Sequence, residues 1–187
     1  GNIPYKSAGA LLDSPISTNA TDVTITGLVT MSDRLNLNDA NNNTFIGESS
    51  GVNNTTGANN LGIGRISLGS NTSGSFNTAI GTLSLQLNTT GAYNVGLGFQ
   101  SGRFIANGTT ANETGGNSIF IGEDTRANAD GQTNQIVIGD SAIGNGSNTV
   151  TLGNSSITDT YLKGNVQTNG SVSATDEVEV TAATGAT

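Results

Sequence analysis

The chain has 187 residues, with 27 Gly, no Cys, no His and a formal net charge of −8 at pH 7. The missing Cys and His exclude disulfides, thiolate metal sites, thiol catalysis and His-based catalytic triads. The acidic balance disfavours nucleic-acid binding, which needs clustered Lys and Arg. No stretch reaches the roughly eighteen apolar residues of a membrane-spanning helix. We therefore expect that the chain neither binds nucleic acid nor inserts into a membrane.

Only 33% of the residues are hydrophobic, 4% are aromatic and 11% are charged. An ordinary globular domain carries roughly a quarter charged residues. Low aromatic content disfavours a large core and low charge disfavours a disordered polyelectrolyte, so the composition fits stacked coils with thin interiors. The first residues, GNIP, are neither basic nor apolar enough for a signal peptide. We expect a fragment, or a protein that leaves its cell by another route such as lysis.

Residues 1–42 precede a repeat and contain three short strand-like runs. Residues 22–26 alternate polar and apolar side chains, and residues 28–31 and 35–37 are short apolar runs around a polar turn. We expect an entry segment that starts and caps the repeats. The alternative is a linker with local strands.

From residue 43 to residue 102 the sequence returns every 17 residues. Asn and Gly recur at constant positions, namely Asn43, Asn60, Asn77 and Asn94, and Gly47, Gly64, Gly81 and Gly98. A fixed period with glycine at constant phase indicates a repeat architecture. Seventeen residues are too few for a helical hairpin, and Gly, Asn, Thr and Ser are poor in helix interiors. The sequence therefore predicts an all-β protein, a parallel β-solenoid with two short strands and two turns per coil.

Within one coil, residues 78–80 predict the first strand and the alternating residues 83–85 predict the second. Residues 71–74 and 88–91 predict turns, because Gly tolerates a positive φ and Asn bonds its own backbone. The apolar residue before each repeated Gly predicts one stacked, inward column: Ile46, Ile63, Ile80, Leu97, Ile121, Ile138 and Leu152. The recurring Asn predicts an amide ladder, with glycan binding by exposed amides as the alternative.

After Gly102 the phase slips, because Gly122 follows Gly98 by 24 residues instead of 17. The additional residues lie in Arg103–Gly116, which we expect to project from the roll as a loop, since stacked strands cannot absorb them. Deleting Asn107–Glu113 is therefore expected to leave the melting temperature nearly unchanged. The repeat then resumes and continues to residue 156, giving about seven coils over residues 43–156. Residues 157–187 predict a strand-rich exit whose last seven residues are poorly packed.

The repeats resemble a known family. NTAIGTLS at 77–84, NVGLGFQS at 94–101 and SIFIGEDT at 118–125 are similar to the head repeat of trimeric autotransporter adhesins. The 17-residue coil with NTTG or NTSG turns looks more like bacteriophage tail fibres, as do the entry at residues 3–16 and the exit at residues 161–173. The resemblance implies a left-handed parallel β-roll assembled as a homotrimer.

The same resemblance implies a structural and host-attachment segment of a trimeric phage-type tail fibre. Its place would be the virion tail or an extracellular surface, and its partners a host cell-surface glycan or protein and other virion tail proteins. The alternative is the head of a bacterial cell-surface trimeric adhesin, although no apolar heptad run predicts the stalk of that family. An ice-binding face is disfavoured because the strands lack a repeated Thr-x-Thr.

Aromatic residues near the insertion are the candidate receptor contacts, because a protruding loop with exposed aromatics suits recognition. The candidates are Phe99, Arg103, Phe104, Asn107 and Asn112. The alternative is that both Phe side chains fill a core widened by the insertion.

The predicted second strand supplies the candidate trimer interface. Few charges protect this surface from association, and the candidates are Ile66, Leu68, Leu83 and Leu85. We expect Leu85→Asp to lower trimer stability far more than Ser75→Asp in a turn.

The remaining patterns predict no chemistry. Glu123, Asp124, Asp130 and Asp140 would suit Ca²⁺ only if two of them met with backbone carbonyls, and solvated turns are the default. No carboxylate pair sits in a recognisable glycosidase frame. The Gly-rich LGIG and VGLG lack the Lys-Ser/Thr of a phosphate loop. We expect no catalytic residues, no metal and no cofactor.

Overall fold

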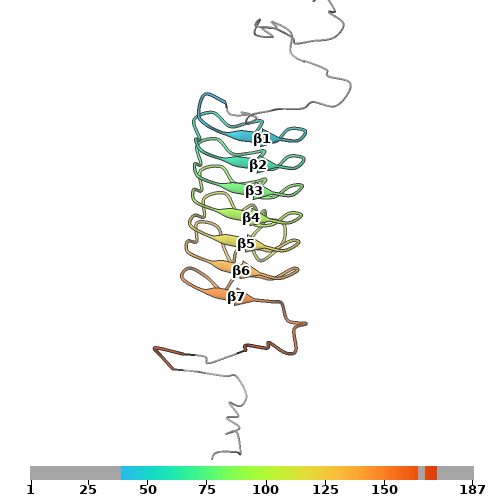
Figure 1. The fold of residues 1–187 in the computed structure, drawn as a ribbon, viewed down its shortest axis with the longest axis vertical. Coiled ribbons are helices and arrows are strands. Elements are labelled where there is room, and N and C mark those ends of the chain that lie inside the picture. Colours follow the sequence, from blue (N-terminus) through green and yellow to red (C-terminus); the bar gives the residue numbers. More distant parts are fainter. Residues whose placement is uncertain (1–38, 164–166, 172–187) are drawn as a thin grey trace, which may run out of the picture. The chain divides into compact units, whose positions relative to one another are not determined.

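The computed structural model describes residues 39–163 and 167–171, which contain strands and turns and no helix. Seven parallel strands form one sheet in chain order: β1 (Thr44–Ile46), β2 (Leu61–Ile63), β3 (Thr78–Ile80), β4 (Val95–Leu97), β5 (Ile119–Ile121), β6 (Ile136–Ile138) and β7 (Val150–Leu152). The chain makes one full turn between successive strands, so it forms a parallel β-solenoid of about six turns (Figure 1). The entry segment's predicted strands lie outside the described residues.

The strands stay in one register along the whole stack. Ile46 pairs with Ile63 and Ile63 with Ile80, as the 17-residue period predicts. Leu97 still pairs with Ile121 across the insertion. Each predicted column of equivalent residues is therefore confirmed as a stack, whatever the length of the intervening coil.

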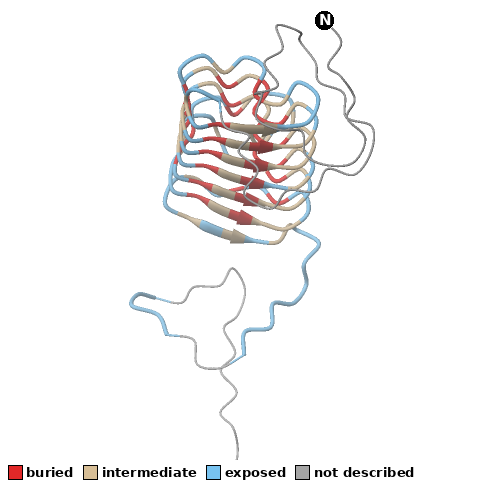
Figure 2. Ribbon diagram, turned by 45° about the horizontal axis from the view of Figure 1, so that its top comes forward, coloured by how far each residue is buried: buried red, intermediate tan, exposed pale blue. Residues whose placement is uncertain are grey.

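The direction of the apolar column, however, was predicted wrongly. Ile46, Leu97 and Leu152 are 43%, 44% and 53% exposed and the other four members are half-buried, whereas the middle residues of β2 to β6, such as Ala79 and Val137, are buried (Figure 2). Side chains alternate across a strand. A three-residue strand therefore turns only its middle residue to the interior, and its first and third residues face outward.

The second predicted strand is a corner instead. Residues 81–86 form turns, and Leu83 and Leu85 have φ of 61° and 46°, in the left-handed region. Leu85 points into the core and is 1% exposed, while Leu83 is half-buried. Two left-handed residues separated by Ser84 reproduce the alternation of a strand, which explains why the pattern misled.

Large and small residues complement each other inside each coil. Phe45 of β1 faces Gly51, where an added Cβ would lie 2.4 Å from the Phe45 Cζ. In the next coil the sizes are reversed, with Gly62 on the strand and the fully buried Leu68 at the corner. The core therefore keeps its volume although individual positions vary.

Buried Asn side chains join the coils. The Oδ1 of Asn43 accepts the backbone N–H of Asn60 at 2.8 Å, and the Oδ1 of Asn60 accepts that of Asn77 at 2.9 Å. Each Nδ2 also donates to a carbonyl, as from Asn77 to Gly91 at 2.9 Å. The predicted ladder is confirmed, but it bonds mainly to backbone groups, and these amides are unavailable to a ligand.

The repeated corner glycines stack directly upon one another. Gly47, Gly64, Gly81 and Gly98 have φ between 129° and 132°, where only Gly is comfortable. A Cβ on Gly81 would lie 2.4 Å from the carbonyl oxygen of Gly98. These positions therefore require Gly for conformation and for space.

The insertion is shorter than predicted. Glu113 O accepts the N–H of Thr89 at 2.9 Å, and Asn112 is buried at the position that Asn88 holds in the previous coil. The regular coil has thus resumed by Asn112, and nine residues, 103–111, replace the two residues 86–87. An antiparallel bridge between Phe104 and Ala111 closes this loop.

We expect the loop to be replaceable by the Gln-Leu of the previous coil at a cost below about 2 kcal/mol, mainly for the lost packing of Ile105. Denaturation followed by circular dichroism measures this cost. The deletion of Asn107–Glu113 is its control and is expected to cost more, because it removes the Asn112 side chain and the Glu113 carbonyl from the stack. Equal losses in both variants would contradict the revised boundary.

The exit contains no strand in its described part. Residues 157–163 and 167–171 are exposed and irregular, so the prediction of a strand-rich exit is wrong for these residues. Residues 164–166 and 172–187 lie outside the described residues.

Candidate functional site

The outer face of the sheet is an uncharged, mostly apolar surface that runs along all seven strands. The first residues of the strands form one column, Thr44, Leu61, Thr78, Val95, Ile119, Ile136 and Val150, and the third residues form the predicted apolar column. None of these fourteen side chains is charged. Four of them, Ile46, Leu97, Val150 and Leu152, are exposed and the other ten are half-buried. A contiguous, partly exposed apolar surface often marks an interaction site.

A pair of aromatic residues lies beside this face. Phe76 and Tyr93 are one coil apart, and their rings stack with centroids 4.9 Å apart and planes 5° apart. Both residues have a left-handed backbone, with φ of 59° and 60°, and remain 48% and 57% exposed. The left-handed conformation costs a bulky residue roughly 1–2 kcal/mol, which the stacking offsets by about 0.5–1.5 kcal/mol.

The predicted interface residues separate into two groups. Leu68 and Leu85 are completely buried in the core of their own chain, so they lie where a partner chain does not reach. Ile66 and Leu83 are half-buried at the outer corner that follows β2 and β3. We therefore expect Leu85→Asp to unfold the roll itself, instead of separating intact chains.

The predicted receptor contacts are likewise only partly brought together. The Arg103 guanidinium lies 4.4 Å from the centroid of the Phe104 ring, and both side chains are half-buried. Phe99 and Asn107 are exposed. Asn112 is 6% exposed and its Nδ2 donates to Gly102 O at 3.2 Å, so it belongs to the core and not to a contact surface.

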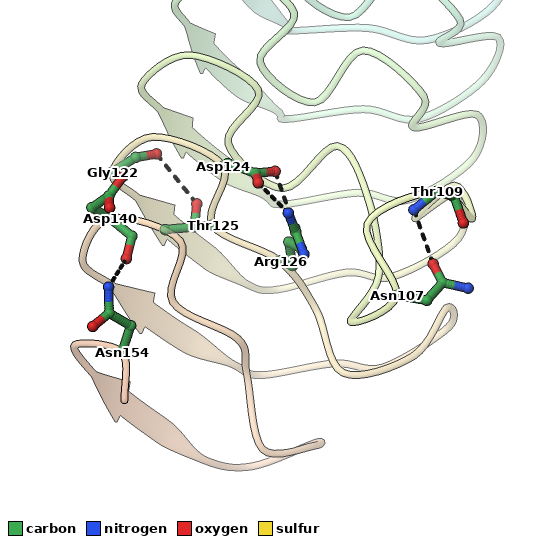
Figure 3. Close-up of polar contacts among 8 residues, drawn as sticks. All are labelled: Asn107, Thr109, Gly122, Asp124, Thr125, Arg126, Asp140 and Asn154. Atoms are coloured by element: carbon green, nitrogen blue, oxygen red, sulfur yellow. Dashed lines mark hydrogen bonds and ion pairs between the residues drawn. The ribbon is translucent and has the colours of Figure 1, made fainter. Parts of the chain in front are cut away.

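The tip of the loop is held by a local hydrogen-bond network. The Oδ1 of Asn107 accepts the backbone N–H of Thr109 at 3.0 Å and that of Thr110 at 2.9 Å (Figure 3). The Nδ2 of Asn107 donates to the Thr110 hydroxyl at 2.7 Å. The tip therefore has a defined turn, with exposed hydroxyls and an amide that suit polar recognition.

Beneath the loop, Arg126 and Asp124 form an ion pair (Figure 3). The Nε of Arg126 donates to the Asp124 carboxylate at 3.1 Å, and hydrogen bonding to this carboxylate raises the pKa of Arg126. Burial lowers the pKa of Arg103, and the charge of Asp124 acts in the opposite direction. The Asp124 carboxylate thus stabilises the charged form of both arginines, Arg126 by an ion pair and Arg103 by its charge.

The candidate Ca²⁺ ligands do not converge. The Asp124 carboxylate is paired with Arg126, and the Asp130 carboxylate accepts the backbone N–H of Glu113 at 2.7 Å and that of Thr114 at 2.8 Å. Burial raises the pKa of Asp130, but these hydrogen bonds outweigh it and leave the pKa below its ordinary value. In the part of the chain that the structure describes, no three acidic side chains gather to hold a metal ion.

The aromatic pair and the first-residue column were missed in the sequence. The available signal was the position before the ladder Asn, where Phe76 and Tyr93 replace an otherwise recurrent Asn. The first-residue column, which is half-buried in β1 to β6, was missed because the strands were expected to turn their third residues inward.

Over residues 39–163 and 167–171, no helix is long and apolar enough to cross a bilayer. Comparisons with protein-family models, with curated proteins and with solved structures found no match to the chain.

Proposed function

We propose that this chain is a structural and host-attachment segment of a homotrimeric tail fibre of the phage type. The observation that carries the proposal is the outer face of the sheet, an uncharged and mostly apolar surface along all seven strands. Three chains that turn this face toward a common axis would remove it from water. At about 4.8 Å per coil, the six spacings give a rod about 30 Å long.

The resemblance of the repeats supplies the number three and the fibre. The 17-residue coil with its Asn-Thr-Thr-Gly turn favours the tail fibre over the adhesin head, whose repeat is shorter. A trimer also presents three copies of each exposed loop, so a weak contact with a cell-surface glycan or protein becomes a strong multivalent one. The receptor contacts in this proposal are Arg103, Phe104 and Asn107, in the inserted loop.

Light scattering on the purified full-length chain is the first test. We expect three times the protomer mass of 18.7 kDa at micromolar concentration. A mass of 18.7 kDa under these conditions would contradict the trimer and the fibre built on it.

Attachment is tested with the fluorescently labelled protein on a panel of bacterial strains. The chain whose loop 103–111 is replaced by Gln-Leu is the matched variant, because it should retain the trimer and lose cell binding. Undiminished binding by this variant would remove the loop from the attachment site.

A further inference from the structure

Two of the corner columns with a left-handed backbone flank the strands, one at each end. The column before the strands has φ between 53° and 63° and consists of Asn42, Asn59, Phe76, Tyr93, Asn117, Asn134 and Asn148. Asn is the side chain that tolerates this conformation best after Gly. The chain departs from Asn only at Phe76 and Tyr93.

The column after the strands has φ between 47° and 61° and consists of Ser49, Ile66, Leu83, Gln100, Asp124 and Ser141. Four of its members are polar, and the two apolar ones, Ile66 and Leu83, again occupy neighbouring coils. Ile66 is β-branched, which makes its left-handed backbone especially unfavourable. The two pairs overlap beside β3, because Ile66 and Leu83 follow β2 and β3 whereas Phe76 and Tyr93 precede β3 and β4.

These four residues recover only part of that cost inside their own chain. Phe76 and Tyr93 stack through one ring face each and remain 48% and 57% exposed. Ile66 and Leu83 are only half-buried. Backbone strain that the protomer does not repay points to an interaction made elsewhere.

The two edges lie at the same height. Phe76 stands two residues before β3 and Leu83 three residues after it, while Tyr93 stands two residues before β4 and the exposed Phe99 two residues after it. Both edges are thus apolar beside β3 and beside β4. Rotation about an axis parallel to the stack leaves the position of every residue along that axis unchanged. One edge of a chain can therefore meet the other edge of a neighbouring copy with no shift along the axis.

We propose that the edge before the strands of one chain, with Phe76 and Tyr93, packs on the edge after the strands of the next chain, with Leu83 and Phe99, head to tail around a ring of three. The inference rests on the proposed trimer and specifies its contact. Such a heterologous contact closes only in a cyclic assembly. The occupant is a second copy, because both apolar edges lie beside the same two strands, β3 and β4, and a copy related by rotation presents one edge to the other at that height.

Paired cysteines test this contact, since the chain has none of its own. The full-length F76C/L83C variant, mildly oxidised, is expected to give a covalent trimer on a non-reducing gel. Within one chain β3 separates the two positions, so a disulfide between them, which needs Cα atoms within about 7 Å, requires a neighbour. The single variants F76C and L83C are expected to give no cross-link.

Covalent dimers from either single variant would mean that like edges meet, and would overturn the proposal. If light scattering gives a trimer but the double variant does not cross-link, the pairing is wrong and the proposed function stands. If light scattering gives a monomer, both fail.

The F76N/Y93N variant tests the same edge without cysteine, because it restores the residue that the column otherwise has. We expect an unchanged or higher melting temperature of the fold, and a trimer dissociation constant at least about tenfold higher. Asn134→Ser, in the same column beside β6, is the control and should leave the dissociation constant unchanged. An intact F76N/Y93N trimer that no longer binds cells would overturn the proposal and assign the aromatic pair to the receptor.

Discussion

Replacing Gly81 by Ala is expected to lower the free energy of unfolding by about 3–5 kcal/mol, through conformational strain and a steric clash together. The φ of 131° is strained for any residue with a Cβ. In addition, the new Cβ would lie 2.4 Å from the Gly98 carbonyl oxygen, a backbone atom that cannot turn aside. The coils would have to separate and weaken their hydrogen bonds. Chemical denaturation followed by circular dichroism measures the loss.

Substitutions at two other glycines distinguish the conformational strain from the steric clash. Gly131 also has a positive φ of 72°, but its Cβ would meet only the Thr114 hydroxyl at 3.4 Å, so Gly131→Ala should show the strain without the clash. Gly170 has no atom within 4 Å and should tolerate Ala. A loss at Gly81 no larger than that at Gly131 would mean that the stack yields and the clash is unimportant.

The second large effect is expected for Asn77→Leu, which keeps the size of the side chain and removes both of its hydrogen-bonding groups. The Asn94 N–H loses its acceptor at 2.9 Å, in a site where Asn77 is 1% exposed, and the Gly91 carbonyl keeps only the Asn88 Nδ2 as a side-chain donor, at 3.0 Å. An unsatisfied buried group costs about 1–3 kcal/mol, so we expect a loss of about 1–3 kcal/mol. The same denaturation experiment measures it.

Asn128→Leu is the control for this change, because Asn128 is exposed and lies outside the ladder. We expect it to change stability by less than about 0.5 kcal/mol. If Asn77→Leu behaves like Asn128→Leu, water or a rearranged backbone satisfies the Asn94 N–H, and the ladder does not hold the coils together.

The period of the sequence predicted the parallel stack and its register, because every coil must offer its backbone groups to the same groups of the next. It could not predict which way a side chain points. In Leu83-Ser84-Leu85 the alternation comes from left-handed backbone at the two Leu residues, and a strand would produce the same pattern. The direction of a three-residue strand depends on a single register step, which moved Ile80 from the expected interior to the outer face.

The boundary of the inserted loop was also predicted wrongly, for a different reason. Seven additional residues were evident from the spacing of Gly98 and Gly122, which does not locate them within the coil. The turn at residues 112–115, NETG, repeats NTTG at 88–91 and was the signal that places them before residue 112. Without this signal, Asn112 was taken for a loop residue with access to a receptor. Its burial follows from its alignment with Asn88, and that alignment depends on the hydrogen bonds of Glu113 to the preceding turn.

The coil that carries the insertion leaves the register of its neighbours unchanged, with Leu97 and Ile121 paired as in a regular coil. Each strand contacts only the strands before and after it, so the roll behaves as a one-dimensional array with nearest-neighbour coupling. In such an array, the length of the roll and the sequence of the inserted loop can change independently. Evolution can lengthen the rod by duplicating a coil, or diversify the loop between residues 103 and 111, and neither change disturbs the other.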